Sequence, residues 1–134
     1  MTLGESIPVI GQFLRITYVE NPGIAFGIRV ANGALFTAFS VLASVFVSVL
    51  LFTHRREKGL FRFGLLLILS GAVGNLIDRI LYRHVADFID IGIHNLRWYV
   101  FNVADSSVVI GMILLAYVVF VSDRKVYPEA DTPS

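Results

Sequence analysis

The sequence of 134 residues has no cysteine and little charge. Without cysteine the chain has no disulfide, zinc ribbon, iron–sulfur cluster or thiol nucleophile. Only 16% of its residues are Asp, Glu, Lys or Arg, against about 25% in typical soluble domains. The formal net charge is +1, so there is neither the basic excess of a nucleic-acid-binding protein nor the acidic excess of a solvated tail. An ordinary soluble domain and a nucleic-acid partner are both disfavoured.

Apolar residues take the place of the missing charges. They make up 56% of the sequence, against about 45–50% in typical domains, and eleven residues are Phe. Residues 30–53 contain no charged side chain. A helix needs about 20 apolar residues to cross the hydrocarbon core of a membrane. Three stretches meet this need, so we expect an all-α integral membrane helix bundle with transmembrane helices at residues 33–53, 60–80 and 103–122.

Positive charges between the first two stretches orient this bundle. The connecting loop contains Arg55, Arg56 and Lys58, and Arg62 lies just beyond it. Cytoplasmic loops of membrane proteins carry an excess of Lys and Arg. We therefore expect a single membrane domain over residues 1–134, with an exterior segment at 1–32, an exterior loop at 81–102 and a cytoplasmic tail at 123–134.

The N-terminal exterior segment has the composition of strands. Residues 13–19 are rich in β-branched and aromatic side chains and lead into Asn21, Pro22 and Gly23, where the Pro-Gly pair favours a type II turn. Residues 24–30 are expected to pair back on residues 13–19. The sequence thus predicts a small β hairpin, or cradle, on the outer face of the membrane.

Polar side chains gather at the outer ends of the predicted helices. Polar groups at membrane depth are costly, so those that remain are candidates for function. Asn75 and Arg79 are four residues apart and share a helix face, which is expected to contact protein rather than lipid. The whole set comprises Asn75, Asp78 and Arg79, then His84, Asp87 and Asp90 in the exterior loop, then Asn102 and Asp105.

The later members of this set allow both structural and catalytic interpretations. Asn102 can cap the third helix, and the helix dipole favours Asp105 in its first turn. Asp87 is flanked by apolar residues, so burial is expected to raise its pKa and suit it to general acid or base catalysis. Asp90 is expected to be solvated.

Asp78, Arg79 and Arg83 allow a structural interpretation of their own. Charged side chains at a helix end can form a salt-bridge cluster that anchors the helix at the membrane interface. This alternative stays open beside a functional role for Arg79.

Two other chemistries have little support. A Ser–Lys dyad needs a lysine near a serine, but Lys58 and Lys125 are the only lysines and both are predicted to be cytoplasmic. His84 and His94 match no spacing typical of metal ligands, so we interpret them as interfacial residues. A pair of aspartates remains.

Two carboxylates held close together share a proton, so the pair can deprotonate a water and protonate a substrate carbonyl. Four blocks of this sequence resemble, in their order and spacing, the lipoprotein signal peptidases (signal peptidase II), a family of bacterial intramembrane aspartic proteases. The blocks are residues 21–27 (NPGIAFG), 71–79 (GAVGNLIDR), 85–90 (VADFID) and 101–106 (FNVADS).

The resemblance implies that Asp87 and Asp105 form a catalytic dyad. The dyad would activate a water and cut a prolipoprotein just before its diacylglyceryl-modified cysteine, without a metal or cofactor. The resemblance also implies residues that bind or orient the substrate: Asn21, which helps to position substrate or cradle; Ala25 and Phe26, which form a lid; and Asn75, Arg79 and Asn102, which bond the peptide backbone or orient the aspartates.

The resemblance further implies a multi-pass protein of the bacterial inner membrane with its active site at the outer leaflet. Its expected partners are the lipidated prolipoprotein and membrane lipids, and a monomer is the expected state. The family usually has four membrane helices, and this chain is expected to begin after the first. Two alternatives stay open: a small non-catalytic membrane protein and an inactive truncated homologue.

Overall fold

The computed structural model describes residues 1–25, 28–29, 33–56 and 59–126. Over these residues the chain forms three long helices, α1 (Gly33–Thr53), α2 (Leu60–Tyr82) and α3 (Val103–Val126). Each includes a segment long and apolar enough to cross a membrane, at Ala34–Thr53, Leu60–Tyr82 and Val103–Val121. The expected set of three membrane helices is confirmed, although α2 and α3 end a few residues later than the sequence predicts.

The helices direct large apolar side chains outward. Phe39, Phe46 and Phe52 of α1 are each more than 60% exposed. Among the side chains that the structure describes, the buried apolar ones are Val47, Leu65 and Val85. An exterior this apolar is unfavourable in water and suits a hydrocarbon solvent.

Glycines let α2 and α3 approach closely. A Cβ atom added at Gly71 would collide with the main-chain oxygen of Ala104, and one added at Gly111 would lie 2.6 Å from the oxygen of Gly64. Small residues at such contacts are typical of helix pairs in membranes, where close backbone packing replaces the hydrophobic effect. The close approach sets the start of α3 beside the middle of α2.

The strands form a four-stranded antiparallel sheet in the order β1 (Ser6–Ile10), β2 (Leu14–Asn21), β5 (Val85–Ile93) and β6 (Leu96–Arg97). A separate pair joins β3 (Ile24–Ala25) to β4 (Ile28–Arg29). The expected pairing of residues 24–30 with residues 13–19 is therefore wrong. β2 is already paired on both sides, with β1 and with the nine residues of β5, while β3 and β4 have two residues each and pair with one another.

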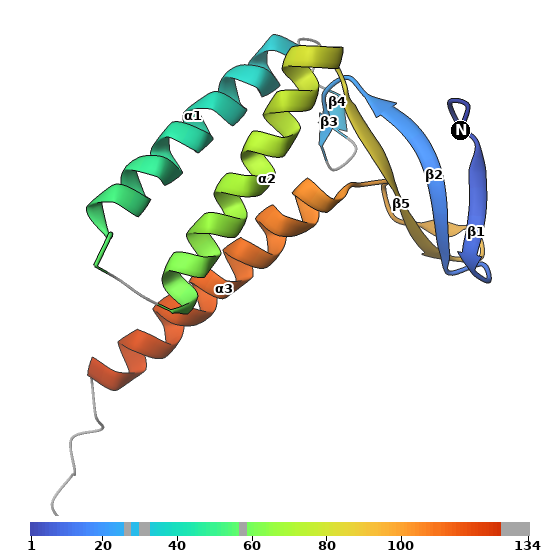
Figure 1. Cartoon of the computed structure of the whole chain (residues 1–134). Coiled ribbons are helices and arrows are strands. Elements are labelled where there is room, and N and C mark those ends of the chain that lie inside the picture. Colours follow the sequence, from blue (N-terminus) through green and yellow to red (C-terminus); the bar gives the residue numbers. More distant parts are fainter. Residues whose placement is uncertain (26–27, 30–32, 57–58, 127–134) are drawn as a thin grey trace, which may run out of the picture.

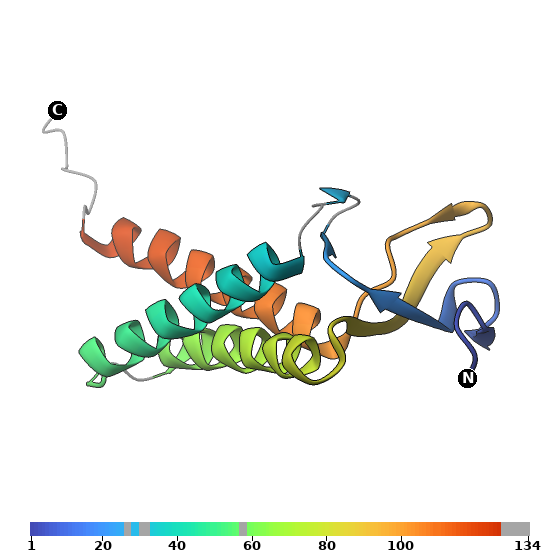
Figure 2. The same cartoon turned by 90° about the horizontal axis from the view of Figure 1, so that it is seen from above.

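The sheet lies beyond one end of the helices (Figure 1). At this end α1 begins, α2 runs into β5, and α3 begins after β6, as the second view also shows (Figure 2). An isolated bridge between Ile89 and Phe101 holds the chain against β5 just before α3 starts. The arrangement brings the middle of β5 to the first turn of α3.

Candidate active site

Two carboxylates meet where β5 reaches α3. Asp87, on β5, is 2% exposed, and Asp105 lies in the first turn of α3. Asn102 is 5% exposed and lies between them. Its Nδ2 donates a hydrogen bond of 2.7 Å to Oδ1 of Asp87.

Asn102 also caps α3, and Asp105 takes part in the cap. The main-chain N–H of Asp105 donates to Oδ1 of Asn102 at 2.9 Å, and the N–H of Asn102 donates to Oδ2 of Asp105 at 3.2 Å. This reciprocal arrangement satisfies main-chain donors that a helix start leaves unpaired. The capping interpretation is confirmed, and it adds to the contact with Asp87 because a different atom of Asn102 makes that contact.

Asn75 of α2 completes the link between the two carboxylates. Its Nδ2 donates to Oδ1 of Asp105 at 2.7 Å, and its Oδ1 accepts from Nδ2 of Asn102 at 3.1 Å. A hydrogen-bonded path therefore runs from Asp87 through Asn102 and Asn75 to Asp105. We call these four residues the Asp–Asn network.

Asn21, at the end of β2, holds the other oxygen of Asp87. Its Nδ2 donates to Oδ2 of Asp87 at 2.8 Å, and its Oδ1 accepts from the main-chain N–H of Gly23 at 3.0 Å. The second bond closes an Asx turn, and Gly23 at its end has a φ of 134°, which is unfavourable for other residues. The local turn thus aims the amide of Asn21 at the carboxylate.

Burial raises the pKa of Asp87 above its ordinary value. The hydrogen bonds from Asn21 and Asn102 oppose this shift, the negative charge of Asp105 adds to it, and the positive charge of Arg79 opposes it. Burial and the nearby carboxylate thus both favour the protonated form of Asp87.

Arg79 of α2 lies beside the network and makes no ion pair within the described chain. Its Nη1 donates to Oγ of Ser40 at 3.2 Å and, more weakly, to the main-chain oxygen of Asn75 at 3.4 Å. The guanidinium carbon is 5.8 Å from the ring centroid of Phe36. Its buried Nε has no hydrogen-bond partner among the described residues. Ser40 and Phe36 were not predicted from the sequence to contact Arg79. The only signal available was the hydroxyl of Ser40 in an otherwise apolar helix.

The expected salt-bridge cluster at the end of α2 is absent from the described part of the chain. Within that part, Arg97 forms an ion pair with Asp90, and Nε2 of His84 lies 3.7 Å from Oε1 of Glu20. Asp78 instead accepts a hydrogen bond of 3.3 Å from the main-chain N–H of Ala86. Its carboxylate stabilises the turn from α2 into β5, so the ionic anchor is a wrong interpretation of these residues.

Asp90 is buried, contrary to the expectation that it is solvated. It is 6% exposed and accepts hydrogen bonds from Oγ1 of Thr17 at 2.8 Å and from Nε of Arg97 at 2.7 Å. Side chains on a regular strand alternate between its faces, so residues three apart point in opposite directions. Between Asp87 and Asp90, the main-chain N–H groups of Phe88 and Ile89 both donate to the oxygen of Phe101. This β-bulge pattern against Phe101 shifts the alternation, and the sequence gives no sign of it.

The two residues expected to form a lid are Ala25 and Phe26, and the structure does not describe their side chains. Phe26 lies outside the described residues. Ala25 is placed in β3 by its backbone, and its side chain also lies outside the description.

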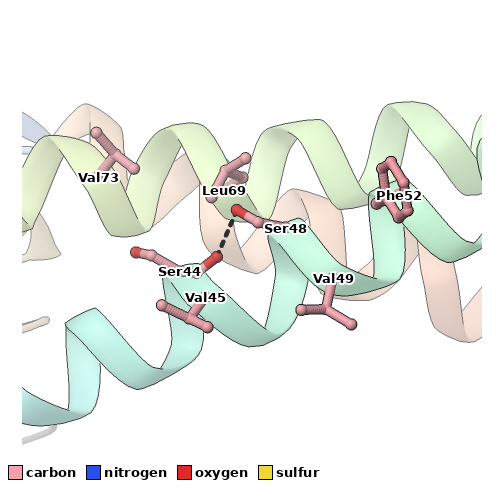
Figure 3. Close-up of a pocket in the computed structure, with 7 residues that line it drawn as sticks. All are labelled: Ser44, Val45, Ser48, Val49, Phe52, Leu69 and Val73. Atoms are coloured by element: carbon pink, nitrogen blue, oxygen red, sulfur yellow. Dashed lines mark hydrogen bonds between the residues drawn. The ribbon is translucent and has the colours of Figure 1, made fainter.

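An apolar groove of about 500 Å³ lies between α1 and α2 (Figure 3). The hydroxyl of Ser48 donates to the main-chain oxygen of Ser44, whose own hydroxyl donates to the oxygen of Ser40. None of the lining side chains is titratable, so the groove is separate from the chemistry of the Asp–Asn network. The lining residues are Ser44, Val45, Ser48, Val49, Phe52, Leu69 and Val73.

Comparisons with known proteins agree on one family. A family model described as signal peptidase (SPase) II matches residues 1–121. A lipoprotein signal peptidase of Moorella thermoacetica is 42% identical over 113 residues, which cover 84% of this chain and 73% of that protein. One from Cupriavidus necator is 42% identical over 118 residues, which cover 85% of this chain and 66% of that protein. The chain thus spans about two thirds to three quarters of the length of these relatives.

The fold has solved counterparts. A bacterial membrane enzyme solved by the in meso method at 2.3 Å resolution has 33% sequence identity and a TM-score of 0.82, covering 99% of this chain and 80% of that one. A second, solved at 1.9 Å, has 37% identity and a TM-score of 0.76, covering 89% of this chain and 77% of that one.

Proposed function

Since this chain belongs to the signal peptidase II family, we propose that it is an aspartic endopeptidase that removes signal peptides from diacylglyceryl-modified bacterial prolipoproteins. The Asp–Asn network is the observation that carries the aspartic mechanism. It links two carboxylates through two amides at one end of the helices, with one carboxylate almost fully buried.

In the proposed reaction, Asp87 and Asp105 share one proton before the substrate is cut. The ionised carboxylate accepts a proton from water as the water oxygen attacks the carbonyl carbon of the scissile peptide bond. The protonated partner donates its proton to the carbonyl oxygen, which gives a neutral tetrahedral intermediate. When the C–N bond breaks, the leaving nitrogen takes the proton of one carboxyl, and the other carboxylate takes a proton from a hydroxyl of the intermediate, so the pair again holds one proton. The new carboxyl and amino ends then depart.

The amides of the network hold the dyad in place for this reaction. Asn102 and Asn21 each donate to Asp87, and Asn75 donates to Asp105. Misplacing a reacting group by about 1 Å can cost about 100-fold in rate, so this orientation is a part of catalysis. The guanidinium of Arg79 lies beside the network, and we assign it the role of bonding the peptide backbone of the substrate.

We place the network at the outer leaflet of the bacterial inner membrane, with the C-terminus in the cytoplasm. The cationic loop between α1 and α2 lies at the opposite end of the helices from the sheet, which supports a cytoplasmic loop (Figure 1). Trp98 and Tyr99 on the sheet side are 60% and 59% exposed, as interfacial aromatic residues are. On this orientation the sheet forms the outer cradle of one membrane domain, which we take to be monomeric.

The test is cleavage of a purified diacylglyceryl-modified prolipoprotein by this chain in lipid bilayers, beside the Asp87→Asn variant. We expect the parent chain to release the signal peptide and Asp87→Asn to lower the rate by about 10²- to 10⁴-fold, the usual contribution of acid–base catalysis. Glu20→Gln is the matched control, because Glu20 is a partly exposed acid next to Asn21 that pairs with His84.

Three outcomes would contradict the proposal or a part of it. Full activity of Asp87→Asn would exclude the dyad, and a folded parent chain that cuts nothing would favour an inactive homologue. Equal cleavage of the same prolipoprotein without its lipid would contradict the proposed substrate class.

A further inference from the structure

A second cluster of polar side chains lies on the sheet, away from the Asp–Asn network. It consists of Asp90, Thr17 and Arg97, and we call it the Asp90 cluster. The guanidinium of Arg97 donates from Nε to Oδ1 of Asp90 at 2.7 Å and from Nη2 to the main-chain oxygen of Asp90 at 3.1 Å. Its Nη1 donates to the main-chain oxygen of Gln12 at 2.9 Å. One arginine therefore ties β5 to the turn between β1 and β2.

Thr17 ties the same carboxylate to β2. Its Oγ1 donates to Oδ2 of Asp90 at 2.8 Å and lies 2.8 Å from the hydroxyl of Ser6 on β1. The pairing of β2 with β5 is irregular between Ile16 and Val19, the segment that holds Thr17. The Asp90 cluster thus spans the irregular part of the sheet.

The bulge of β5 lies between Asp87 and Asp90. The main-chain N–H groups of Phe88 and Ile89 both donate to the oxygen of Phe101, at 3.0 and 2.7 Å. Two residues of β5 thereby oppose one residue of the facing segment, which is the pattern of a β-bulge. Such bulges redirect side chains, and here Asp87 and Asp90 are both buried although they are three residues apart.

The bulge also contacts the residue that precedes Asn102. Phe101 accepts both hydrogen bonds and donates its own N–H to the oxygen of Ile89 at 3.1 Å. The geometry of the bulge therefore sets two positions at once, that of the Asp87 carboxylate and that of the Asn102 amide that bonds to it.

We infer that Asp90 is a positioning residue, which together with Thr17 and Arg97 holds the bulge of β5 so that the carboxylate of Asp87 faces Asn102 and Asn21. The inference rests on the proposed function, because the positioned carboxylate belongs to the proposed dyad. Asp90 does not touch the network, so its effect reaches the reaction through the backbone of β5.

Substitutions in the Asp90 cluster can separate the effect of side-chain charge from that of side-chain shape. Asp90→Asn keeps the shape of the side chain and an oxygen for Thr17, but it leaves the mostly buried Arg97 without its anionic partner. Removing one member of a buried ion pair destabilises its surroundings because the other charge stays uncompensated. Thr17→Val removes the hydroxyl with little change in volume, and Thr17→Ser restores it.

The experiment measures kcat and KM on the lipidated prolipoprotein, and hydrogen exchange at the amides of Phe88 and Ile89, for the full chain in lipid. We expect Asp90→Asn to lower kcat by about 10-fold or more, to leave KM within about twofold, and to speed exchange at both amides. Thr17→Val should give a smaller loss of kcat, which Thr17→Ser should restore. Glu20→Gln should match the parent in both measurements.

An unchanged kcat in Asp90→Asn, or a loss of rate fully explained by a smaller folded fraction, would overturn the inference. Faster exchange at the two amides in a chain whose parent form cuts nothing would support the positioning role and contradict the proposed function. Unchanged exchange in such a chain would contradict both.

Discussion

The amide of Asn102 is bonded both to Asp87 and to Asn75, while its oxygen caps the helix that carries Asp105. One side chain therefore stabilises α3 and aligns the carboxylates. These two roles use different atoms, so they can be separated by substitution. The pKa of Asp87, which burial raises, depends on the same amide and on that of Asn21.

Asn102→Ala removes both roles, and Asn102→Ser removes one. Serine keeps an oxygen that caps a helix but has no amide to donate to Asp87. We expect Asn102→Ala to lower the free energy of unfolding by about 1 kcal/mol and kcat by about 100-fold. Asn102→Ser should recover most of the stability and little of the rate. Thermal unfolding and cleavage assays check this, and recovery of the rate by serine would be inconsistent with the alignment role.

Asn21→Ala tests the electrostatics of Asp87. The bond from Asn21 stabilises the ionised carboxylate and lowers the pKa of Asp87, so its removal should raise that pKa further. The pH profile of kcat/KM loses activity on its alkaline side when the shared proton leaves the dyad. We expect Asn21→Ala to move this alkaline limb to higher pH. A shift to lower pH would contradict the assignment.

The same raised pKa affects stability. Because the folded state binds the Asp87 proton more tightly than the unfolded state, this group stabilises the fold fully below the ordinary carboxyl pKa of 3.8. That contribution is lost as the pH rises through the raised value in the folded protein.

The contact between α2 and α3 is an element-scale support for the site. Gly71 packs against Ala104, the residue before Asp105, whereas Gly111 packs against Gly64 further along the helices. Neither contact has room for a methyl group, so both helices depend on glycine here. The two contacts differ in their distance along α3 from the network.

Gly71→Ala and Gly111→Ala should therefore separate stability from activity. Overpacking of this kind costs about 1–3 kcal/mol, so both variants should unfold at lower temperature. We expect Gly71→Ala to lower kcat more than Gly111→Ala, because it displaces the first turn of α3. Cleavage rates normalised to folded protein check this, and equal losses in the two variants would argue against the packing account.

The sequence predicts the helices better than it predicts the pairing of the strands. The helices follow from long apolar stretches, which are a local signal. Strand pairing depends on distant segments, so the partners of β2 could not be derived from the turn at Pro22 and Gly23. The residues of the Asp–Asn network can be recognised in the sequence of 71–106 because polar groups are rare in so apolar a chain. The burial of Asp90 and the contact of Ser40 with Arg79 arise only when distant elements pack.

At the scale of the whole molecule, the two ends of the helix bundle lie on opposite sides of the membrane in the proposed topology. The sheet and the Asp–Asn network lie at one end, and the loop with Arg55 and Arg56 lies at the other (Figure 1). The proposed chemistry requires the network to lie on the side where lipidated prolipoproteins are presented. The orientation of the chain in the membrane is therefore as important for the proposed reaction as the geometry of the Asp–Asn network.

The absence of cysteine makes this orientation easy to measure. Trp98→Cys and Arg56→Cys would each place one thiol in a chain that has none. We expect a membrane-impermeant maleimide to label Trp98→Cys in intact spheroplasts and to label Arg56→Cys after permeabilisation. The reverse pattern would place the network in the cytoplasm and contradict the assigned topology.

The most direct test of the central claim is a double-mutant cycle on the two aspartates. Residues that act as one catalytic unit are strongly non-additive, so removing either costs about as much as removing both. We predict that Asp87→Asn, Asp105→Asn and the double variant reduce cleavage of lipidated prolipoprotein to the same low rate, each in a folded chain. Rate losses that multiply in the double variant would show that the two carboxylates act independently, and the proposed dyad would then be wrong.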